Sequence, residues 1–544
     1  MIIILSHLIF FSFIIYFNGK IFLDFINNNL RIFNFFETLI FGIIITGFIG
    51  QILNFFIPLN NNLIFVNLIL IIFVNFRKYK TFYFKVLKED YLIKFLLLIF
   101  ISILIYGSEF SDDLNHYHGG YIINTDNLNY IFGLNFLHNH YGYSSIWLIL
   151  HSYLNFNDNL LQDIHVLNGI LFVSILGLLI NKILINIKNK RAVYFNSILI
   201  FFLFFIILKY TRLKEFGIDR PGFLIVIFFF YYYFKFYLVD NVKYLNKHYD
   251  LVLISFFLFS IKVIFLPFLV MSITLFIYNL IKNNHLKIFQ SKFNIVLLVL
   301  GISYISKNFL ISGCIIYPID IFCFNKIPWS SSTLIQDLTI NTESTNKSFR
   351  NYSGDLTPSL YIQNFNWVET WVKRNFIELF EFLLTTLICA LFTIYSTFKA
   401  KIETNNIRKF IYFLSTIFIL TIFITLKTPV IRMFHHLFLI FGIFIILFHF
   451  RKKQIYIKKN IFYSFLILII CFSLSKNIKR IYEKDFVNNP KMLIKDIGWY
   501  ETPKLRKLES FNYYNGWNDK FPIGNEDLSE YNYTKLFIFN IISK

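Results

Sequence analysis

The chain is poor in charged residues and in cysteine. Only 15% of its 544 residues are charged, 56% are hydrophobic, and the mean hydropathy is +0.59. Soluble globular domains carry roughly 25% charged residues, so this composition, spread over repeated apolar runs, excludes that class and indicates an integral membrane protein. The four cysteines are too few for a disulfide scaffold. Only Cys314 and Cys323 could share an exposed loop, where they either pair or stay free.

Acidic residues are also scarce, with 31 Asp and Glu against 52 Lys and Arg and a net charge of +21. In a soluble protein this excess would suggest nucleic acid, but here the basic residues cluster in short loops between apolar runs. The charge therefore indicates membrane topology, and no nucleic-acid partner is expected. The first apolar run, residues 2–17, lacks both a basic leader region and a small-residue cleavage site, which predicts a retained helix.

The apolar runs predict an all-α membrane protein, a polytopic helical bundle of about 12–14 transmembrane helices, since a span needs about 20 apolar residues and fewer when it is broken. Five basic loops, residues 77–88, 188–191, 282–292, 399–409 and 451–459, should all be cytoplasmic. Alternating crossings put these five loops on one side only if residues 251–278 cross the membrane twice. That stretch is then a broken hairpin, interrupted at Lys262 and Pro267, and both chain termini lie outside. The expected spans are 2–17, 36–57, 62–76, 92–106, 166–187, 194–208, 221–239, 251–262, 263–278, 294–311, 376–398, 408–426, 432–450 and 460–475.

The same alternation then places the long loops and the C-terminal tail on the outer face. A transmembrane domain, residues 1–475, carries two long outer loops, residues 107–165 and 312–375. It is followed by a C-terminal tail, residues 476–544, which is polar and aromatic and predicts a small outer-face subdomain. Within the first loop, residues 144–154 are apolar but too short to span, and we expect a helix lying in the membrane interface.

The first outer loop lacks lysine and arginine altogether, yet it holds six of the twelve histidines. Asp112 and Asp113 follow an expected membrane helix, and two carboxylates so close at an apolar boundary should have their pKa values pushed apart, which suits a general base. The alternative is two solvated loop acids. The absence of a neighbouring cation in the sequence favours the functional interpretation.

Histidines recur in this loop at a spacing of two. His116 with His118, and His138 with His140, would share a face only in an extended strand. Together with the acidic pair they could supply a divalent cation with oxygen and nitrogen ligands. None of these spacings is a zinc signature, so the histidines equally suit the membrane interface or hydrogen bonds to a substrate, and no cofactor is assigned.

Cations at expected outer helix ends suit an anionic ligand. Lys262 lies within an apolar stretch, where a charge costs several kcal/mol unless it is paired or faces water; the alternative is snorkelling to the interface. Arg432 and Arg350 suit bidentate contact with a phosphate, although arginines beside helices also serve as interface anchors. Glu215, Asp219 and Arg220 fall in a short outer loop where Arg212 and Lys214 offer local pairing, which favours a self-contained ion cluster over a functional role.

This pattern resembles the GT-C superfamily of membrane glycosyltransferases, which includes the protein O-mannosyltransferases and the bacterial aminoarabinose transferases. The resemblance implies an acidic pair after an early membrane helix, interface helices, a lysine at a short-helix hairpin and a late arginine for the lipid phosphate. The corresponding positions are Asp112 with Asp113, residues 144–154, Lys262 and Arg432.

Three stretches are more closely similar to a family of uncharacterised bacterial polytopic proteins regarded as GT-C-like. They are Asp-Asp-Leu-Asn-His-Tyr-His (residues 112–118) and residues 133–147 and 310–318, so the resemblance covers residues 106–328 and Arg432. In the better-known enzymes the pair often reads Asp-Glu or Glu-Asp, whereas here it is Asp-Asp followed by two histidines.

The resulting hypothesis is a glycosyltransferase of the bacterial inner membrane. It would move a sugar from a polyprenyl-phosphate donor to an envelope glycan, lipid or protein on the periplasmic face, with membrane lipid around it. Asp112 or Asp113 would be the base, Lys262, Arg432 and Arg350 would hold the lipid phosphate, and His116, His118 and His138 would orient substrate. The alternatives are a lipid-linked glycan flippase or transporter, expected to show inverted repeats, and an envelope polysaccharide polymerase that depends on arginines rather than on the acidic loop.

Overall fold

The structure is a computed structural model of the chain, and it is built almost entirely from helices. It describes residues 2–26, 33–60, 62–78, 91–106, 117–155, 166–190, 195–210, 213, 217–235, 246–282, 292–324, 326–403, 407–450, 453–483, 504–508, 511–515, 531–536 and 539–543. The longer helices are α1 (Ile2–Ile26), α2 (Phe35–Leu53), α3 (Asn62–Lys78), α5 (Tyr91–Tyr106), α9 (Leu167–Lys188), α10 (Asn196–Lys209), α11 (Asp219–Phe234), α12 (Asn246–Ile261), α13 (Leu266–Lys282), α14 (Lys292–Ser312), α15 (Ser332–Asn346), α17 (Val368–Tyr395), α18 (Ile407–Lys427), α19 (His435–Phe450) and α20 (Lys459–Glu483).

Short elements fill the loops between them. The short helices are α6 (Gly119–Asn127), α7 (Leu134–Leu137), η2 (Asn139–Tyr143), α8 (Ile146–Tyr153), η5 (Val263–Phe265), η7 (Asp320–Phe322), η8 (Phe349–Asn351), α16 (Pro358–Tyr361) and η9 (Ile431–Met433). The strands form three antiparallel pairs, β1 (Thr397–Glu403) with β2 (Lys453–Ile457), β3 (Lys504–Leu508) with β4 (Phe511–Asn515), and β5 (Asn532–Leu536) with β6 (Phe539–Ser543).

The bundle has an enclosed centre and an apolar outer surface. Every residue of α11 from Pro221 to Phe234 is buried, and so is most of α10, as expected for helices that are apolar on all sides. At the periphery, α3, α14, α17 and α18 expose large apolar side chains such as Ile69, Leu298 and Phe423. In water such a surface would be unfavourable, so it indicates contact with lipid.

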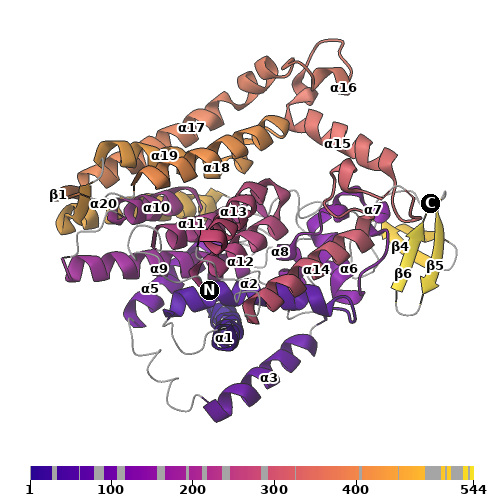
Figure 1. Ribbon diagram of the computed structural model, residues 1–544, viewed down its shortest axis with the longest axis horizontal. Helices are drawn as coiled ribbons and strands as arrows, with labels where there is room; N and C mark the ends of the chain where they lie inside the picture. The colour runs from indigo at the N-terminus through magenta and orange to yellow at the C-terminus, as the bar shows by residue number, and fades with distance from the viewer. Residues whose placement is uncertain are drawn as a thin grey trace.

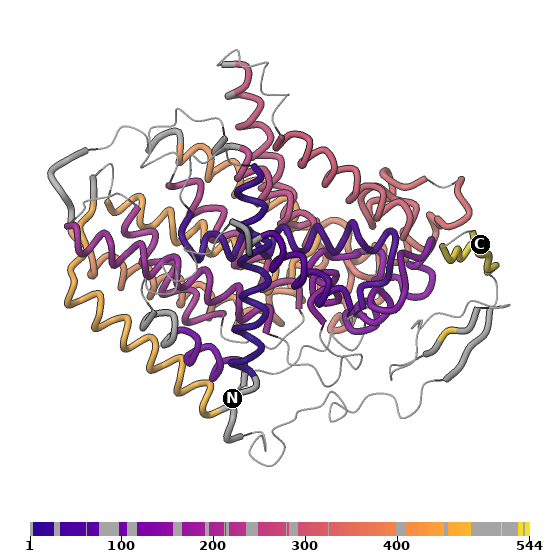
Figure 2. The backbone as a smooth tube through the Cα atoms, turned by 90° about the horizontal axis from the view of Figure 1, so that it is seen from below, coloured from indigo at the N-terminus to yellow at the C-terminus, as the bar shows by residue number. Residues whose placement is uncertain are grey.

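Each of the fourteen expected spans coincides with a helix. Within the part of the chain that the structure describes, seven helices are long and apolar enough to cross a membrane, and five more are apolar but shorter. The protein is therefore a helical, multi-pass membrane protein. Figure 1 looks almost along α1, whereas α17, α18 and α19 run side by side across the view, so α1 crosses the long helices steeply, as the turned view in Figure 2 also shows. A Cβ at Gly42 would lie 2.0 Å from the carbonyl oxygen of Ile15, so α1 and α2 cross closely at a glycine.

The broken hairpin expected at Lys262 is confirmed. Helix α12 ends at Ile261, Lys262 is extended with φ −159° and ψ 134°, and η5 leads directly into α13. Pro267 is the second residue of α13, where its missing N–H costs no helical hydrogen bond. The bend therefore arises where an ionisable side chain and a proline interrupt one apolar run.

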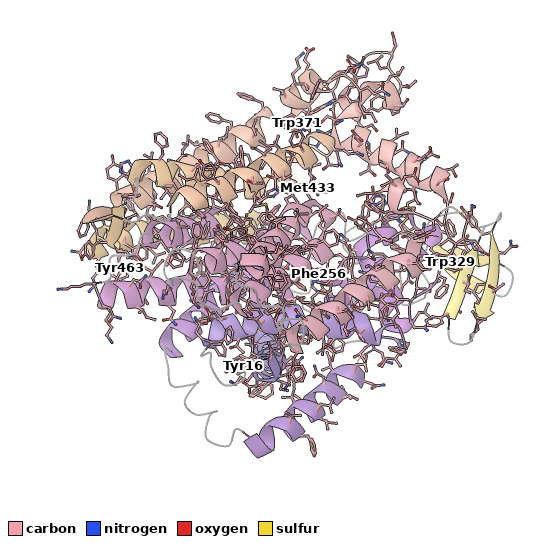
Figure 3. The ribbon with its side chains drawn as sticks, in the orientation of Figure 1. Tyr16, Phe256, Trp329, Trp371, Met433 and Tyr463 are labelled. Atoms are coloured by element: carbon pink, nitrogen blue, oxygen red, sulfur yellow. A yellow bond between two sulfur atoms is a disulfide. The ribbon has the colours of Figure 1, made fainter. Side chains whose placement is uncertain are left out.

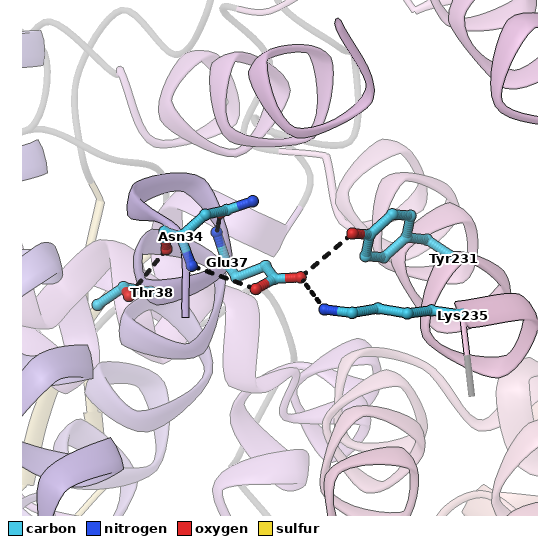
Figure 4. A network of polar contacts seen from close by, with 5 residues as sticks. All are labelled: Asn34, Glu37, Thr38, Tyr231 and Lys235. Carbon is cyan, nitrogen blue, oxygen red and sulfur yellow. Dashed lines mark hydrogen bonds and ion pairs between the residues drawn. The ribbon is translucent and has the colours of Figure 1, made fainter. Parts of the chain in front are cut away.

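Contacts at one end of the bundle join helix ends that the alternation of spans assigns to the cytoplasmic side. Glu37 forms a capping box with Asn34 at the start of α2, and its Oε1 accepts hydrogen bonds from Lys235 Nζ at 2.7 Å and Tyr231 OH at 3.2 Å, at the far end of α11 (Figure 4). Strands β1 and β2 join the segments that follow α17 and α19, and Asn196 at the start of α10 donates to the carbonyl of Ile455 in β2. The alternation deduced from charge is thus consistent with the packing.

The first outer loop folds inward. The helix expected at residues 144–154 is present as α8, but all eight of its residues are buried, with contacts to α2, α6 and α12. Neighbouring helices therefore cover this helix, and its place relative to the membrane interface stays a prediction. Cys314 and Cys323 form a disulfide in the second outer loop, so the paired alternative holds there.

The last hairpin packs on the outer loops. Phe132 N donates to Asn540 O and Ile542 N donates to Phe132 O, each at 2.9 Å, so β6 extends a segment of the first loop. Phe132 also packs against Trp329 and Phe539, and Figure 3 shows Trp329 beside the yellow hairpin. The expected outer-face tail therefore contains folded strands that rest on the transmembrane domain.

Candidate functional site

Asp219 lies at the start of α11 and joins two cations from distant parts of the chain. Its Oδ1 is 2.6 Å from Lys262 Nζ, and its Oδ2 is 3.6 Å from Arg432 Nε. Lys262 sits in the bend between α12 and η5, and Arg432 lies in η9, just before α19. We call Asp219, Lys262 and Arg432 the ion triad.

The three members of the ion triad differ in exposure. The side chains of Asp219 and Lys262 are 19% and 22% exposed, whereas that of Arg432 is 52% exposed. Figure 3 places Met433, the neighbour of Arg432, toward the α15 side of the bundle, which is also the side of the outer loops. With one carboxylate and two cations, the ion triad carries a net positive charge. The guanidinium of Arg432 is its most exposed charged group.

The electrostatics of Asp219 favour its ionised form. Burial alone would raise the pKa of this carboxyl, but the charges of Lys262 and Arg432 and the hydrogen bond from Lys262 outweigh it and lower the pKa below its ordinary value. The positive charge that His118 can carry acts in the same direction, so this histidine lies near the ion triad. Asp219 is thus an ion-pair partner and not a general base.

His118 is buried at the start of α6 and belongs to a group of rings. Tyr117 packs against His118 with ring centroids 4.3 Å apart and against His140 at 4.9 Å, and His138 lies 5.3 Å from His140. His138 Nδ1 accepts a hydrogen bond from the backbone N–H of His140 at 3.1 Å, which fixes the turn into η2. We call Tyr117, His118, His138 and His140 the histidine cluster.

The histidine cluster continues into the protein through His151 in α8. Burial, together with the charge that His118 can carry, lowers the pKa of His151 to about 3. His151 is therefore neutral at physiological pH.

A third cation, Lys209, lies among the helix ends that meet near the start of α11. Lys209, at the end of α10, forms an ion pair with Glu381 of α17 at 2.7 Å and lies 4.0 Å above the ring of Phe382. That ring packs against His435, which in turn packs against Phe223 in the first turn of α11. The outer ends of α10, α11, α17 and α19 therefore meet around the start of α11.

The predicted site residues separate into four groups. Lys262 and Arg432 come together as expected, and His118 and His138 belong to one cluster. Arg350 is exposed in η8, and the described residues provide no contact between it and the ion triad. Asp112, Asp113 and His116 lie outside the described residues, so their roles stay predictions.

The metal prediction also stays open. Among the side chains that the structure describes, no three His, Cys, Asp or Glu residues lie close enough together to hold a metal ion. The expected ligand set, however, included Asp112, Asp113 and His116, which are not among them.

Asp219 is the residue that sequence reasoning missed. The expectation of a self-contained ion cluster in its loop was wrong for this residue, because Asp219 pairs with Lys262 in the bend after α12 and with Arg432 in η9. Arg212, Lys214 and Glu215 lie outside the described residues. The available signal was the position of Asp219 two residues before Pro221, at the start of a helix that is fully buried from Pro221 on. An acid at such a boundary must either be solvated or find a cation.

The chain belongs to the family described as a domain of unknown function (DUF8201), and the match covers residues 1–439. The ion triad and the histidine cluster lie within the matched region, and the C-terminal hairpins lie beyond it. No curated protein and no solved structure matches the chain.

Proposed function

We propose that the protein is a GT-C-type membrane glycosyltransferase that uses a polyprenyl-phosphate sugar as donor. The observation that carries the proposal is the meeting of Lys262 and Arg432 at Asp219, on the side of the bundle that bears the outer loops. These are the two cations to which the GT-C resemblance assigns the lipid phosphate. A site of this kind needs fixed positive charge beside the membrane, where the leaving phosphate develops its negative charge.

The ion triad suits this chemistry because it holds one cation firmly and leaves the other accessible. Lys262 is neutralised by Asp219, which sets its position, while the half-exposed Arg432 offers a planar donor to a phosphate. In the transfer step the acceptor oxygen bonds to the anomeric carbon, and the carbon–oxygen bond to the phosphate breaks. The phosphate leaves with that electron pair and is stabilised by Arg432.

The acceptor hydroxyl must lose a proton in the same step. Asp112 or Asp113 would take it, and the histidine cluster, which begins a few residues further along the chain, would orient the acceptor. Because His118 lies both near Asp219 and in this cluster, it links the donor and acceptor sides of the proposed site.

The proposal places about 12–14 crossings in a bacterial inner membrane with the site on the periplasmic face. The Cys314–Cys323 disulfide supports this orientation, because disulfides persist in oxidising compartments outside the cytoplasm. An envelope glycan, lipid or protein would be the acceptor.

The test is transfer of labelled sugar from a polyprenyl-phosphate donor by membranes that contain the full-length protein. Arg432→Gln, Asp112→Asn and Asp113→Asn should each lower the rate at least about 100-fold, which is the usual loss when one group that stabilises a transition-state charge is removed. Lys373→Gln is the matched control, because this outer-face cation is 74% exposed and pairs only locally with Glu369. Full activity in both aspartate variants, with normal expression, would refute the proposal.

A further inference from the structure

A lateral groove opens between α1, α2 and α14, away from the ion triad. Its volume is about 460 Å³, within the range of roughly 300–1,000 Å³ typical of ligand sites. All three helices contribute to its walls, which include Asn18 and Phe25 of α1 and Lys292, Ile295, Val296 and Val299 of α14.

The groove is chemically suited to a hydrocarbon chain. Except for Asn18 and Lys292, all the residues that line it are apolar. The Asn18 side-chain amide already donates a hydrogen bond to Thr46 Oγ1 at 3.1 Å, so one of its N–H groups is used within the protein. A polar ligand would therefore find few partners along the walls, whereas an alkyl chain would bury its surface against them.

The rim of the groove faces the lipid side of the bundle. Phe25, Ile295 and Val299 are 54%, 61% and 45% exposed, and Leu298 and Ile302 continue the exposed apolar surface of α14. All three helices are long and apolar enough to cross a membrane. A chain could thus enter sideways from the bilayer without passing through water.

Lys292 gives the groove one charged end. It is the first residue of α14, it is exposed, and its ammonium lies 5.2 Å from the centre of the Phe25 ring. Within the described residues no carboxylate pairs with it. An ammonium at the end of an apolar channel is complementary to a lipid phosphate, and basic residues near a leaflet surface attract anionic lipids.

We infer that this groove binds one acyl chain of an anionic phospholipid, with the phosphate at Lys292. The phospholipid belongs to the leaflet at the start of α14, whereas the other end of α14 leads into the loop with Cys314. The groove site is therefore separate from the proposed donor site and does not rest on the proposed transferase activity.

The chain-binding part is tested by native mass spectrometry of the full-length protein, purified from nanodiscs with equal phosphatidylglycerol and phosphatidylcholine. The native protein should retain one phosphatidylglycerol. Val296→Trp, which fills the groove, should lower the retained lipid about tenfold, whereas Leu298→Trp should not, because Leu298 is exposed on the same helix and does not line the groove. Equal retention in the two tryptophan variants would overturn the inference.

The headgroup part is tested by Lys292→Gln, with Lys459→Gln as control, because Lys459 is likewise an exposed lysine that opens a long apolar helix, α20. Lys292→Gln should still retain a lipid but should lose about fivefold in preference for phosphatidylglycerol, as expected for one basic residue near a membrane surface. An unchanged preference, or displacement of the phospholipid by added polyprenyl phosphate at equal concentration, would overturn the assignment to an anionic phospholipid.

Discussion

Asp219 is the ion-pair partner of both Lys262 and Arg432, the two cations of the ion triad. A lysine in an apolar stretch is unfavourable unless it is paired or reaches water, and Asp219 provides that partner at 2.6 Å. The pair is only about one-fifth exposed, with 22% for Lys262 and 19% for Asp219, so its two charges interact more strongly than a surface pair would. Removing the charge of Asp219 alone leaves the ammonium of Lys262 poorly solvated. Removing both charges leaves no such unpaired group.

This asymmetry gives a prediction for stability. Asp219→Asn should lower the free energy of unfolding by about 2 kcal/mol, toward the lower end of the range for breaking a buried pair, because water still reaches both side chains. The double variant Asp219→Asn with Lys262→Met should recover at least half of that loss. Thermal unfolding of the detergent-solubilised protein checks both values.

Lys20→Met provides a comparison, because Lys20 pairs with Asp24 only four residues away in the same helix. That variant should change stability by no more than about 0.5 kcal/mol. If Asp219→Asn proves equally mild, the ion triad does not hold the outer helix ends together.

At the scale of elements, the C-terminal hairpin depends on one glycine. Gly133 has φ +72° and a Cβ there would lie 2.3 Å from the carbonyl oxygen of Ile542, so backbone and not a flexible side chain is in the way. The same residue donates its N–H to the carbonyl of Leu310 at 3.0 Å. Gly133 therefore permits the first outer loop, the end of α14 and strand β6 to meet at one point.

Gly133→Ala should loosen this junction. The substitution strains a left-handed backbone conformation and pushes against β6, so the tail should become several-fold more sensitive to limited proteolysis. Gly301→Ala is the matched control, because nothing lies within 4 Å of its added Cβ and it should leave the cleavage rate unchanged or lower it. Equal cleavage in the two variants would show that the hairpin does not depend on this contact.

Sequence patterns predicted elements better than they predicted partners. The bend at Lys262 followed from a lysine and a proline inside one apolar run, and the structure confirms it. Helix α17, however, begins at Val368 rather than at 376, because its first two turns are polar and are held by pairs such as Lys373–Glu369, which apolar periodicity does not detect. The burial of α8 and the partners of Asp219 depend on helices far away in the sequence, so no local pattern could specify them.

For the whole molecule, the packing separates two ends of the bundle. The ion triad and the disulfide mark one end, and the Glu37–Lys235 pair with the β1–β2 ribbon marks the other. The charge pattern predicts that the second end faces the cytoplasm, because the alternation of spans assigns the basic segments of the sequence to that side.

Thiol labelling tests this orientation. With a membrane-impermeant maleimide on sealed right-side-out vesicles, Ser359→Cys in α16 should react fully, and Lys458→Cys beside β2 should react only after the vesicles are opened. Each substitution is made in a chain whose native cysteines are replaced by alanine. The reverse labelling pattern would place the ion triad in the cytoplasm and would contradict the proposed function.

The pairing of Phe132 with Asn540 and Ile542 has a consequence for biosynthesis. The first outer loop leaves the ribosome long before strand β6, which pairs with it. The backbone groups of Phe132 therefore stay unpaired while most of the chain is synthesised and inserted. An unpaired strand edge is prone to pair wrongly with other chains. Pairing of this loop edge therefore comes after most of the helical bundle has been synthesised.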